Sequence, residues 1–306
     1  MTDDDAMILR HIYRHRFISS EDLCRLFPER SEDKLSRRLT LLYRAGFLDR
    51  PTSQVDYHMH GGGSKALVHG LDNEGARFLK DKLGIAIDTG NWRIRNRAYK
   101  KDSLDHTLAV TKFLVDVEVS CRERKNIEYI PFDEILKRAP IETQRSPTPM
   151  RMKVPISWQG NRGTVLLTPD AIFGLRVTGG EGVRKESYVF LEIDRGSMTI
   201  VPAERTRETE AFLHRTSVLR KFVCYAEGHR QGLPRKVFGI QSARVLTLTV
   251  SEDRSEVMRN AAEAHVVKPM RVPPGLFLFG VQSSLKNALE ANFCSTAKAE
   301  VLLQAC

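Results

Sequence analysis

Residues 31–46 read SEDKLSRRLTLLYRAG and have the pattern of an amphipathic helix. Leu35, Leu39 and Leu42 recur at helical spacing, so they lie on one face. The serine that opens the stretch is a natural N-cap, and the glycine that closes it is a natural left-handed end. Four basic side chains fall mostly outside the apolar face, namely Lys34, Arg37, Arg38 and Arg44. The stretch therefore predicts a helix that packs through leucines and presents cations.

Around this helix, residues 6–83 predict helix, helix, helix, hairpin and helix, with hairpin strands at 47–50 and 65–69. Three helices and a β-hairpin are the order of a winged helix-turn-helix, whose third helix enters the DNA major groove. We therefore expect residues 1–90 to form such a domain and to bind double-stranded DNA. A winged helix that binds protein stays an alternative. The expected nucleic-acid contacts are Lys34, Arg37, Arg38, Arg44, Arg50, Lys65, Arg93, Arg95 and Arg97, with His58 and His60 also on the wing.

The charge of the chain favours a polyanionic partner, because 48 Lys and Arg against 38 Asp and Glu give +10. Residues 91–102 are expected to form a basic linker, which is either merely exposed or clamps the phosphate backbone. Five scattered cysteines without a CxxC motif predict neither disulfides nor a cysteine zinc site. No apolar run has membrane-helix length, and the start of the chain is acidic. We expect a cytoplasmic, nucleoid- or plasmid-associated protein with no membrane contact.

Residues 103–306 alternate helical and strand patterns, which predicts a mixed α/β or α+β layer structure. A stretch with four prolines, 139–155, is expected to be irregular. The expected helices are 104–122, 206–227 and 254–264, and the expected strands are 127–132, 164–177, 187–195, one or two within 237–250, and 276–281.

Carboxylates gather on two of these strands. Pro169-Asp170 falls in one and Glu192-Ile193-Asp194 in the next, and alternation puts Glu192 and Asp194 on one face. Carboxylates buried without partners are costly, and hard oxygen ligands suit Mg²⁺ or Mn²⁺. The pattern predicts a metal site with Asp170 and Glu192 as ligands and the Ile193 carbonyl as a further one. The alternative is an ion-pair network with Arg176, Arg195 or Arg205.

The arrangement resembles the PD-(D/E)XK nuclease fold, in which P-D and (D/E)-x-K lie on neighbouring strands. Pro169-Asp170 and Glu192 match, but Asp194 stands where the family has lysine. The resemblance implies a Mg²⁺- or Mn²⁺-dependent site whose catalytic residues are Asp170, Glu192, Asp194 and, in place of the missing lysine, Lys221 of the next helix. The departure at Asp194 implies that activity is lost unless Lys221 replaces that function.

The two halves together resemble the bacterial replication-relaxation family. The similarity rests on the N-terminal helices and hairpin and on four further motifs, Asp105-His106, Pro169-Asp170, LEIDRGS at 191–197, and Lys221 with Tyr225. It implies a role in plasmid or mobile-element replication, relaxation or mobilisation, with relaxosome or replication proteins as further partners. It also implies a restriction-endonuclease-like domain over residues 103–306. An active endonuclease or nickase, a transcriptional regulator or assembly adaptor, and a homodimer stay open as alternatives.

His11 and His15 are four residues apart and could bind a metal from one helix face. No neighbouring carboxylate or cysteine completes a ligand set, so the sequence favours two ordinary histidines. Glu118 is a candidate for the helix carboxylate of the nuclease-like fold.

Overall fold

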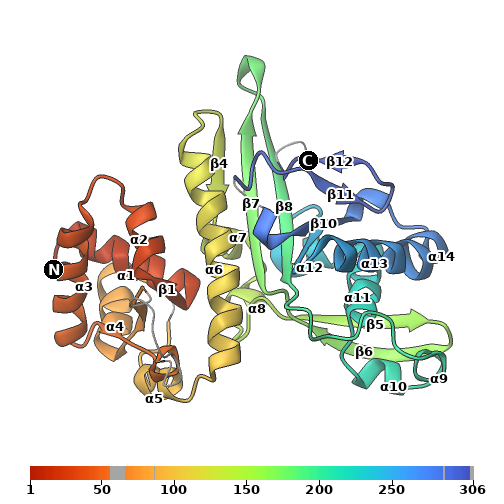
Figure 1. Ribbon diagram of the computed structural model, residues 1–306, viewed down its shortest axis with the longest axis horizontal. Coiled ribbons are helices and arrows are strands. Elements are labelled where there is room, and N and C mark those ends of the chain that lie inside the picture. Colours follow the sequence, from red (N-terminus) through yellow and green to blue (C-terminus); the bar gives the residue numbers. More distant parts are fainter. Residues whose placement is uncertain (56–65, 86, 285–286, 304–306) are drawn as a thin grey trace. The chain divides into compact units, whose positions relative to one another are not determined.

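The computed structural model describes residues 1–55, 66–85, 87–284 and 287–303. The chain divides into two compact units, Met1–Val119 and Ser120–Cys306. The structure is mixed α and β in both (Figure 1). Within the described residues, no helix has the length and apolar character needed to cross a membrane.

The first unit contains helices and one small antiparallel sheet with strand order β1-β3-β2. Helix α6 begins in this unit, and its last residues belong to the second. The elements in chain order are α1 (Asp3–His15), β1 (Phe17–Ser19), α2 (Ser20–Leu26), α3 (Glu32–Arg44), β2 (Leu48–Asp49), the 3₁₀ turn Thr52–Gln54, β3 (Val68–Leu71), α4 (Asn73–Leu83), α5 (Trp92–Arg97) and α6 (Lys101–Arg122).

The core of the first unit forms as the leucine spacing of α3 predicts. Leu35, Leu39 and Leu42 are all buried and pack with apolar side chains of α1, α2 and α4. A close approach fixes α4 against the chain just before β2, because a Cβ on Gly75 would lie 2.3 Å from the Phe47 carbonyl oxygen. Only glycine fits there without a backbone shift.

Residues 91–102, expected as a linker, lie inside the first unit and contain α5. Trp92 is buried in the core, and the buried Asn96 amide donates to Asp49 Oδ2 at 3.0 Å and to the Leu71 carbonyl at 2.9 Å. Arg93, Arg95 and Arg97 lie on this short helix, which Trp92 and Asn96 anchor to the first unit. The tip of the expected wing, including His58, His60 and Lys65, lies outside the described residues.

The second unit is built on a seven-stranded mixed sheet of order β12-β11-β10-β9-β8-β7-β4. Its helices are α7 (Phe132–Arg138), α8 (Ile141–Gln144), α9 (Glu204–Arg207), α10 (Ala211–His214), α11 (Val218–Arg230), α12 (Leu233–Phe238), α13 (Glu252–Ala262), the π-helical turn Glu263–Val267 and α14 (Lys268–Met270). Its strands are β4 (Ile127–Ile130), β5 (Met152–Trp158), β6 (Asn161–Leu167), β7 (Ala171–Thr178), β8 (Arg184–Ile193), β9 (Arg244–Thr249), β10 (Phe277–Val281), β11 (Phe293–Ser295) and β12 (Glu300–Val301).

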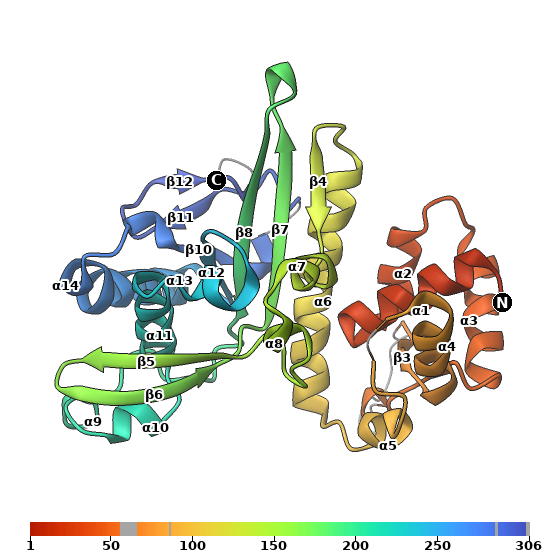
Figure 2. The ribbon, with the colours of Figure 1, turned by 180° about the vertical axis from the view of Figure 1, so that it is seen from behind.

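The connections of this sheet position the carboxylates. Strands β4, β7 and β8 pair antiparallel, and β8, β9 and β10 pair parallel. Helix α11 lies in the crossover from β8 to β9, and α13 in that from β9 to β10. Strands β5 and β6 form a separate two-stranded arm between β4 and β7 in the chain (Figures 1 and 2).

Three expected elements differ from the structure. The strand expected at 164–177 is two strands, because Pro169 has no N–H for the ladder and the chain leaves β6 before it. The helix expected at 206–227 is broken, because Ser217 caps a new helix by accepting from the Arg220 amide. The irregular stretch 139–155 contains α8 and the start of β5.

Candidate functional site

Asp170 lies at the base of the β7–β8 hairpin, next to the carboxylate of the opposite strand. Its amide donates to the Leu191 carbonyl at 3.0 Å, and its Oδ2 accepts from the Ile193 amide at 2.8 Å. These two bonds bracket Glu192 in the opposite strand. Pro169 cannot continue the ladder of β6, and the next strand, β7, begins at Ala171. The proline therefore places Asp170 immediately before the start of β7.

Glu192 is buried and held by two side chains of α11. Lys221 Nζ lies 2.5 Å from Glu192 Oε2, and the Tyr225 hydroxyl donates to Oε1. Lys221 and Tyr225 are one helical turn apart, which puts both on the same face of α11. Glu192 is 4% exposed, so its carboxylate is shielded from water.

The electrostatics of this group are set by burial and by a second negative charge. Burial, with the nearby charge of Asp170, raises the pKa of Glu192 to about 7, although Lys221 and Tyr225 oppose the shift. Burial alone would lower the pKa of Lys221, but the charges of Glu192 and Asp170 outweigh it and raise that pKa. Burial and the Glu192 charge also raise the pKa of Tyr225 well above its ordinary value. The lysine is therefore the cation that stabilises two neighbouring carboxylates.

Asp194 has different partners and sits just beyond the end of β8. Arg254 of α13 contacts it twice, with Nε 2.6 Å from Oδ2 and Nη2 3.0 Å from Oδ1. The Thr249 hydroxyl donates to Oδ2 at 2.6 Å, and the Gly196 amide donates at 3.1 Å. Burial would raise the pKa of Asp194, but the hydrogen bonds from Arg254 and Thr249 lower it.

The contacts of Glu192 and Asp194 are those of an ion-pair network, in which Lys221 and Arg254 are the cations. Lys221 pairs with Glu192, and Arg254 pairs with Asp194. Arg176, expected as a partner, instead bridges Glu128 and Glu186 on neighbouring strands. Arg254 is 60 residues from Asp194, and no local sequence signal links them.

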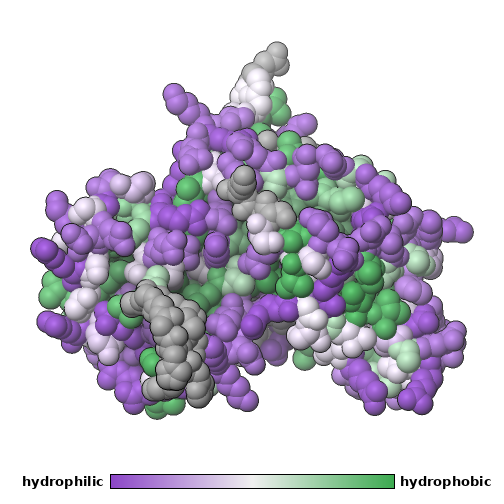
Figure 3. All heavy atoms as spheres, in the orientation of Figure 1, coloured by the Kyte–Doolittle hydropathy of each residue, from purple (hydrophilic) through white to green (hydrophobic). Residues whose placement is uncertain are grey.

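The outer face of α3 is a second candidate site. Lys34, Arg37 and Arg44 are exposed, and none of them forms an ion pair with another residue in the described part of the chain. They lie along one side of the helix with the exposed Leu41 between them. The surface over α3 is mostly hydrophilic in Figure 3. We call these four residues the α3 outer face.

Most of the other expected nucleic-acid contacts that the structure describes have partners of their own. Arg38 pairs with the buried Asp5 of α1, and Arg93 pairs with the buried Asp72. Arg95 pairs with an exposed acid and also donates to the Gly90 carbonyl at 2.7 Å. Arg50 stacks on Tyr43, with 4.4 Å from its guanidinium carbon to the ring centroid. Arg97 is exposed and, within the described residues, makes no ion pair.

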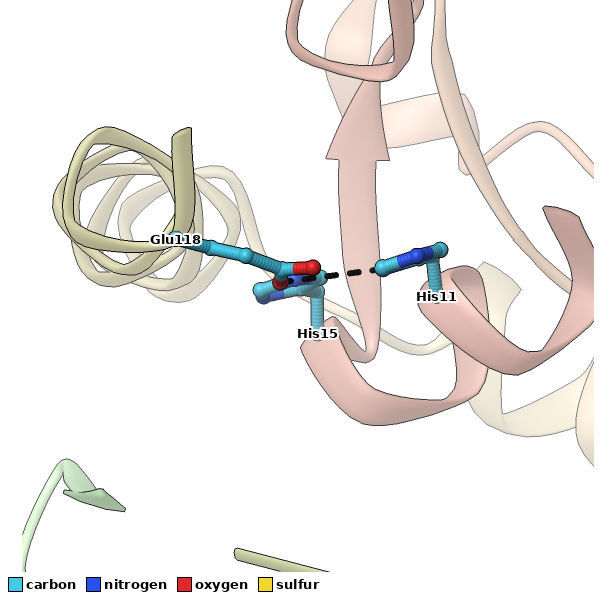
Figure 4. Close-up of side chains that lie close together, drawn as sticks. All are labelled: His11, His15 and Glu118. Carbon is cyan, nitrogen blue, oxygen red and sulfur yellow. Dashed lines mark ion pairs between the residues drawn. The ribbon is translucent and has the colours of Figure 1, made fainter. Parts of the chain in front are cut away.

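One set of side chains in the first unit was not expected from the sequence. Glu118 of α6 lies beside His11 and His15 of α1 (Figure 4). It is the carboxylate that the local sequence around the two histidines does not provide. Within the described residues, this is the one group of three or more His, Cys, Asp or Glu side chains whose ligand atoms all lie within 4.8 Å of one another.

Comparison with known proteins identifies one family. A family model described as replication-relaxation matches residues 9–236, which is well over half of the 306 residues. No curated protein and no solved structure matches the chain at a significant level. The matched region runs from α1 to α12 and includes Asp170, Glu192 and Lys221 as well as the α3 outer face. The chain therefore belongs to the replication-relaxation family.

Proposed function

We propose that this chain binds duplex DNA through the α3 outer face and acts in the replication or mobilisation of a mobile genetic element. The observation that carries the proposal is the contrast within α3. Arg38 is held by Asp5, whereas Lys34, Arg37 and Arg44 point to solvent with no ion-pair partner among the described residues. Cations that are not paired within the protein are those that can neutralise phosphates or bind guanine edges.

Three further observations support this proposal. The element order α1, β1, α2, α3, β2, β3 is the order that a winged helix-turn-helix requires. The exposed Leu41 lies between the cations of the α3 outer face, where an apolar side chain can contact a thymine methyl group. Membership in the replication-relaxation family agrees with a DNA substrate. The second unit would then serve as a platform for partner proteins.

The test is DNA affinity as a function of salt. In fluorescence anisotropy with a labelled duplex, Lys34→Ala, Arg37→Ala and Arg44→Ala combined should weaken binding and flatten its salt dependence. Three lost phosphate contacts correspond to a decrease of about 2 to 3 in the slope of log K against log salt. An unchanged slope and affinity would overturn the proposal.

A charge-matched control distinguishes the effect of losing the α3 outer face from the effect of lowering the net charge of the protein. Arg184, Lys185 and Lys236 are exposed cations of the second unit, and the structure shows no ion pair for them among the described residues. Replacing all three by alanine removes the same charge and should leave most of the affinity. If this control weakens binding as much as the α3 variant, the effect is nonspecific and the proposed surface is wrong.

A metal-dependent nuclease is the second candidate function, favoured by Asp170 and Glu192 lying side by side with a lysine from the next helix. Mg²⁺ or Mn²⁺ would be held by Asp170 and Glu192, and it would supply charge stabilisation at a phosphoryl oxygen. The donor set fits only in part, because Lys221 already occupies Glu192 Oε2, and Asp194 is bound by Arg254. These contacts favour a second unit that serves as a platform for partner proteins over one that cleaves DNA.

Supercoiled plasmid tests the second candidate directly. Wild type and Glu192→Gln are incubated with plasmid and Mn²⁺, and nicked and linear products are measured. Nicking by wild type that Glu192→Gln abolishes would establish the nuclease. Equal, intact plasmid in both reactions would exclude it and leave the DNA-binding proposal as it stands.

A further inference from the structure

The three side chains of the first unit introduced above converge on one point. His11 and His15 lie one turn apart on α1, with ring centroids 6.4 Å apart and ring planes within 8° of parallel. Glu118 approaches them from α6, and its Oε2 lies 3.9 Å from His11 Nδ1. Figure 4 shows the three side chains directed toward one another from the two helices. Three potential ligands therefore meet from segments about 100 residues apart in the chain.

All three residues are buried, with 8%, 6% and 7% of the residue surface exposed for His11, His15 and Glu118. Neither ring nitrogen of His15 has a hydrogen-bond partner among the described residues. Buried polar atoms are nearly always paired, because an unpaired one forfeits its interaction with water. A buried imidazole aimed at another imidazole and a carboxylate is thus a second observation, independent of the clustering, that points to a ligand.

The surrounding structure holds the two helices in place. The Thr111 hydroxyl, two turns before Glu118 on the same side of α6, donates to the Phe17 carbonyl at 2.9 Å. Asp116 forms an ion pair with Arg25 of α2 at 2.5 Å. The ring of Phe27 packs edge-on against His11 with 5.6 Å between centroids. The backbone positions of the three ligands are thus fixed before any ion binds.

We propose that His11, His15 and Glu118 form a binding site for Zn²⁺. Two imidazoles and one carboxylate are a ligand set that Zn²⁺ takes, whereas Mg²⁺ and Ca²⁺ prefer oxygen ligands alone. Tetrahedral bonds of about 2.1 Å place neighbouring ligand atoms roughly 3.4 Å apart. The ligand atoms here lie within 4.8 Å of one another, so small side-chain rotations bring them to that distance.

Three protein ligands leave a fourth position for water or for a group of a partner. The ion would join α1 to α6 inside the first unit, and α1 also carries Asp5, the partner of Arg38 on α3. Metal binding would therefore stabilise the unit that presents the α3 outer face. This site is separate from the carboxylates of the second unit and does not depend on DNA binding.

The experiment uses the full chain without a polyhistidine tag, stripped of metal with a chelator. Titration with Zn²⁺ against a chromophoric chelator should give one ion per chain, and Zn²⁺ should raise the melting temperature. Glu118→Gln, which keeps the shape of the side chain, should weaken Zn²⁺ binding about 100-fold or more and remove the thermal shift. His15→Ala should do the same. His229→Ala, on α11 of the second unit, is the matched control and should bind as wild type does.

Co²⁺ gives a readout that needs no variant. Wild type loaded with Co²⁺ should show the intense visible absorption of a four-coordinate ion, and Zn²⁺ should displace it. The proposal is overturned if the wild type binds no stoichiometric Zn²⁺. It is equally overturned if Glu118→Gln and His15→Ala bind Zn²⁺ as tightly as wild type, since the ion would then sit elsewhere.

Discussion

Replacing Glu192 by glutamine should change how the stability of the protein depends on pH. Burial and Asp170 raise the folded-state pKa of Glu192 to about 7, against an ordinary value of 4.5. Because this pKa is raised on folding, the contribution of Glu192 is fully present below pH 4.5 and is lost as pH rises through 7. One pKa unit corresponds to about 1.4 kcal/mol, so the loss between pH 4.5 and 8 is about 3 kcal/mol.

Glutamine keeps the size and can still accept from Tyr225, but it does not ionise. Glu192→Gln should therefore gain about 3 kcal/mol relative to wild type as pH rises from 4.5 to 8, whatever the offset between the two at low pH. Titrating groups that do not interact with Glu192 cancel in this difference. His69, whose pKa burial lowers to about 4, contributes equally to both proteins.

The assay is urea unfolding of both proteins at several pH values, with the free energy of unfolding compared at each. Glu128→Gln is the control, because this glutamate lies on β4 with a 59% exposed side chain. Because this side chain is exposed, the control variant measures the effect of replacing a glutamate that is not buried. Parallel curves for wild type and Glu192→Gln would show that the carboxylate is not desolvated as described, and the account of Glu192, Lys221 and Asp170 would be wrong.

Three further substitutions test the packing by their effect on the midpoint of urea unfolding. Leu39→Ala should destabilise by about 2–5 kcal/mol, because Leu39 is 1% exposed in the core of the first unit; a cost below 1 kcal/mol would contradict that packing. Arg254→Ala should cost about 1–3 kcal/mol by removing the cation from Asp194, and Asp194→Asn in the same chain should recover part of it. Gly75→Ala should cost at least about 1–3 kcal/mol, because its Cβ would meet the Phe47 carbonyl; a neutral effect would show that α4 shifts freely.

Local patterns of the sequence are enough to predict much of the fold. The leucine spacing of α3 gives a helix and its buried face, because period and burial are properties of one segment. The expected return strand appears as β3, although β1 joins the same sheet and no pattern in its three residues, Phe17–Ser19, predicts it. Short strands depend on their neighbours for pairing, and a single segment does not contain that information.

The candidate site is predictable in part for the same reason. Alternation along β8 and the proline before Asp170 bring the two carboxylates together, and the position of Lys221 on the next helix brings it to Glu192. The partner of Asp194 was not predictable, since Arg254 reaches it from α13. Charged side chains often pair with residues that are distant in the chain, and the spacing of residues along the sequence does not predict such pairs.

Glu118 is a second residue whose neighbours could not be predicted from the sequence. The sequence offered it as the helix carboxylate of the nuclease-like fold, but the structure places it beside His11 and His15 in the first unit. Two histidines four residues apart are visible in the sequence, whereas a carboxylate on another helix is visible only once α1 and α6 are packed together.

The acidic start of the chain has a consequence for how the first unit would search DNA. Asp5 caps α1 by accepting from the Thr2 amide at 2.6 Å and also pairs with Arg38, while Asp4 pairs with Arg30. Arg30, which precedes α3, and Arg38, on α3, are thus neutralised by acidic partners and are less available for nonspecific contacts with DNA phosphates. Replacing Asp4 and Asp5 by neutral residues would leave both guanidinium groups free to contact phosphates and would strengthen binding to all DNA sequences. The ratio of specific to nonspecific binding, on which finding a target site depends, would then fall.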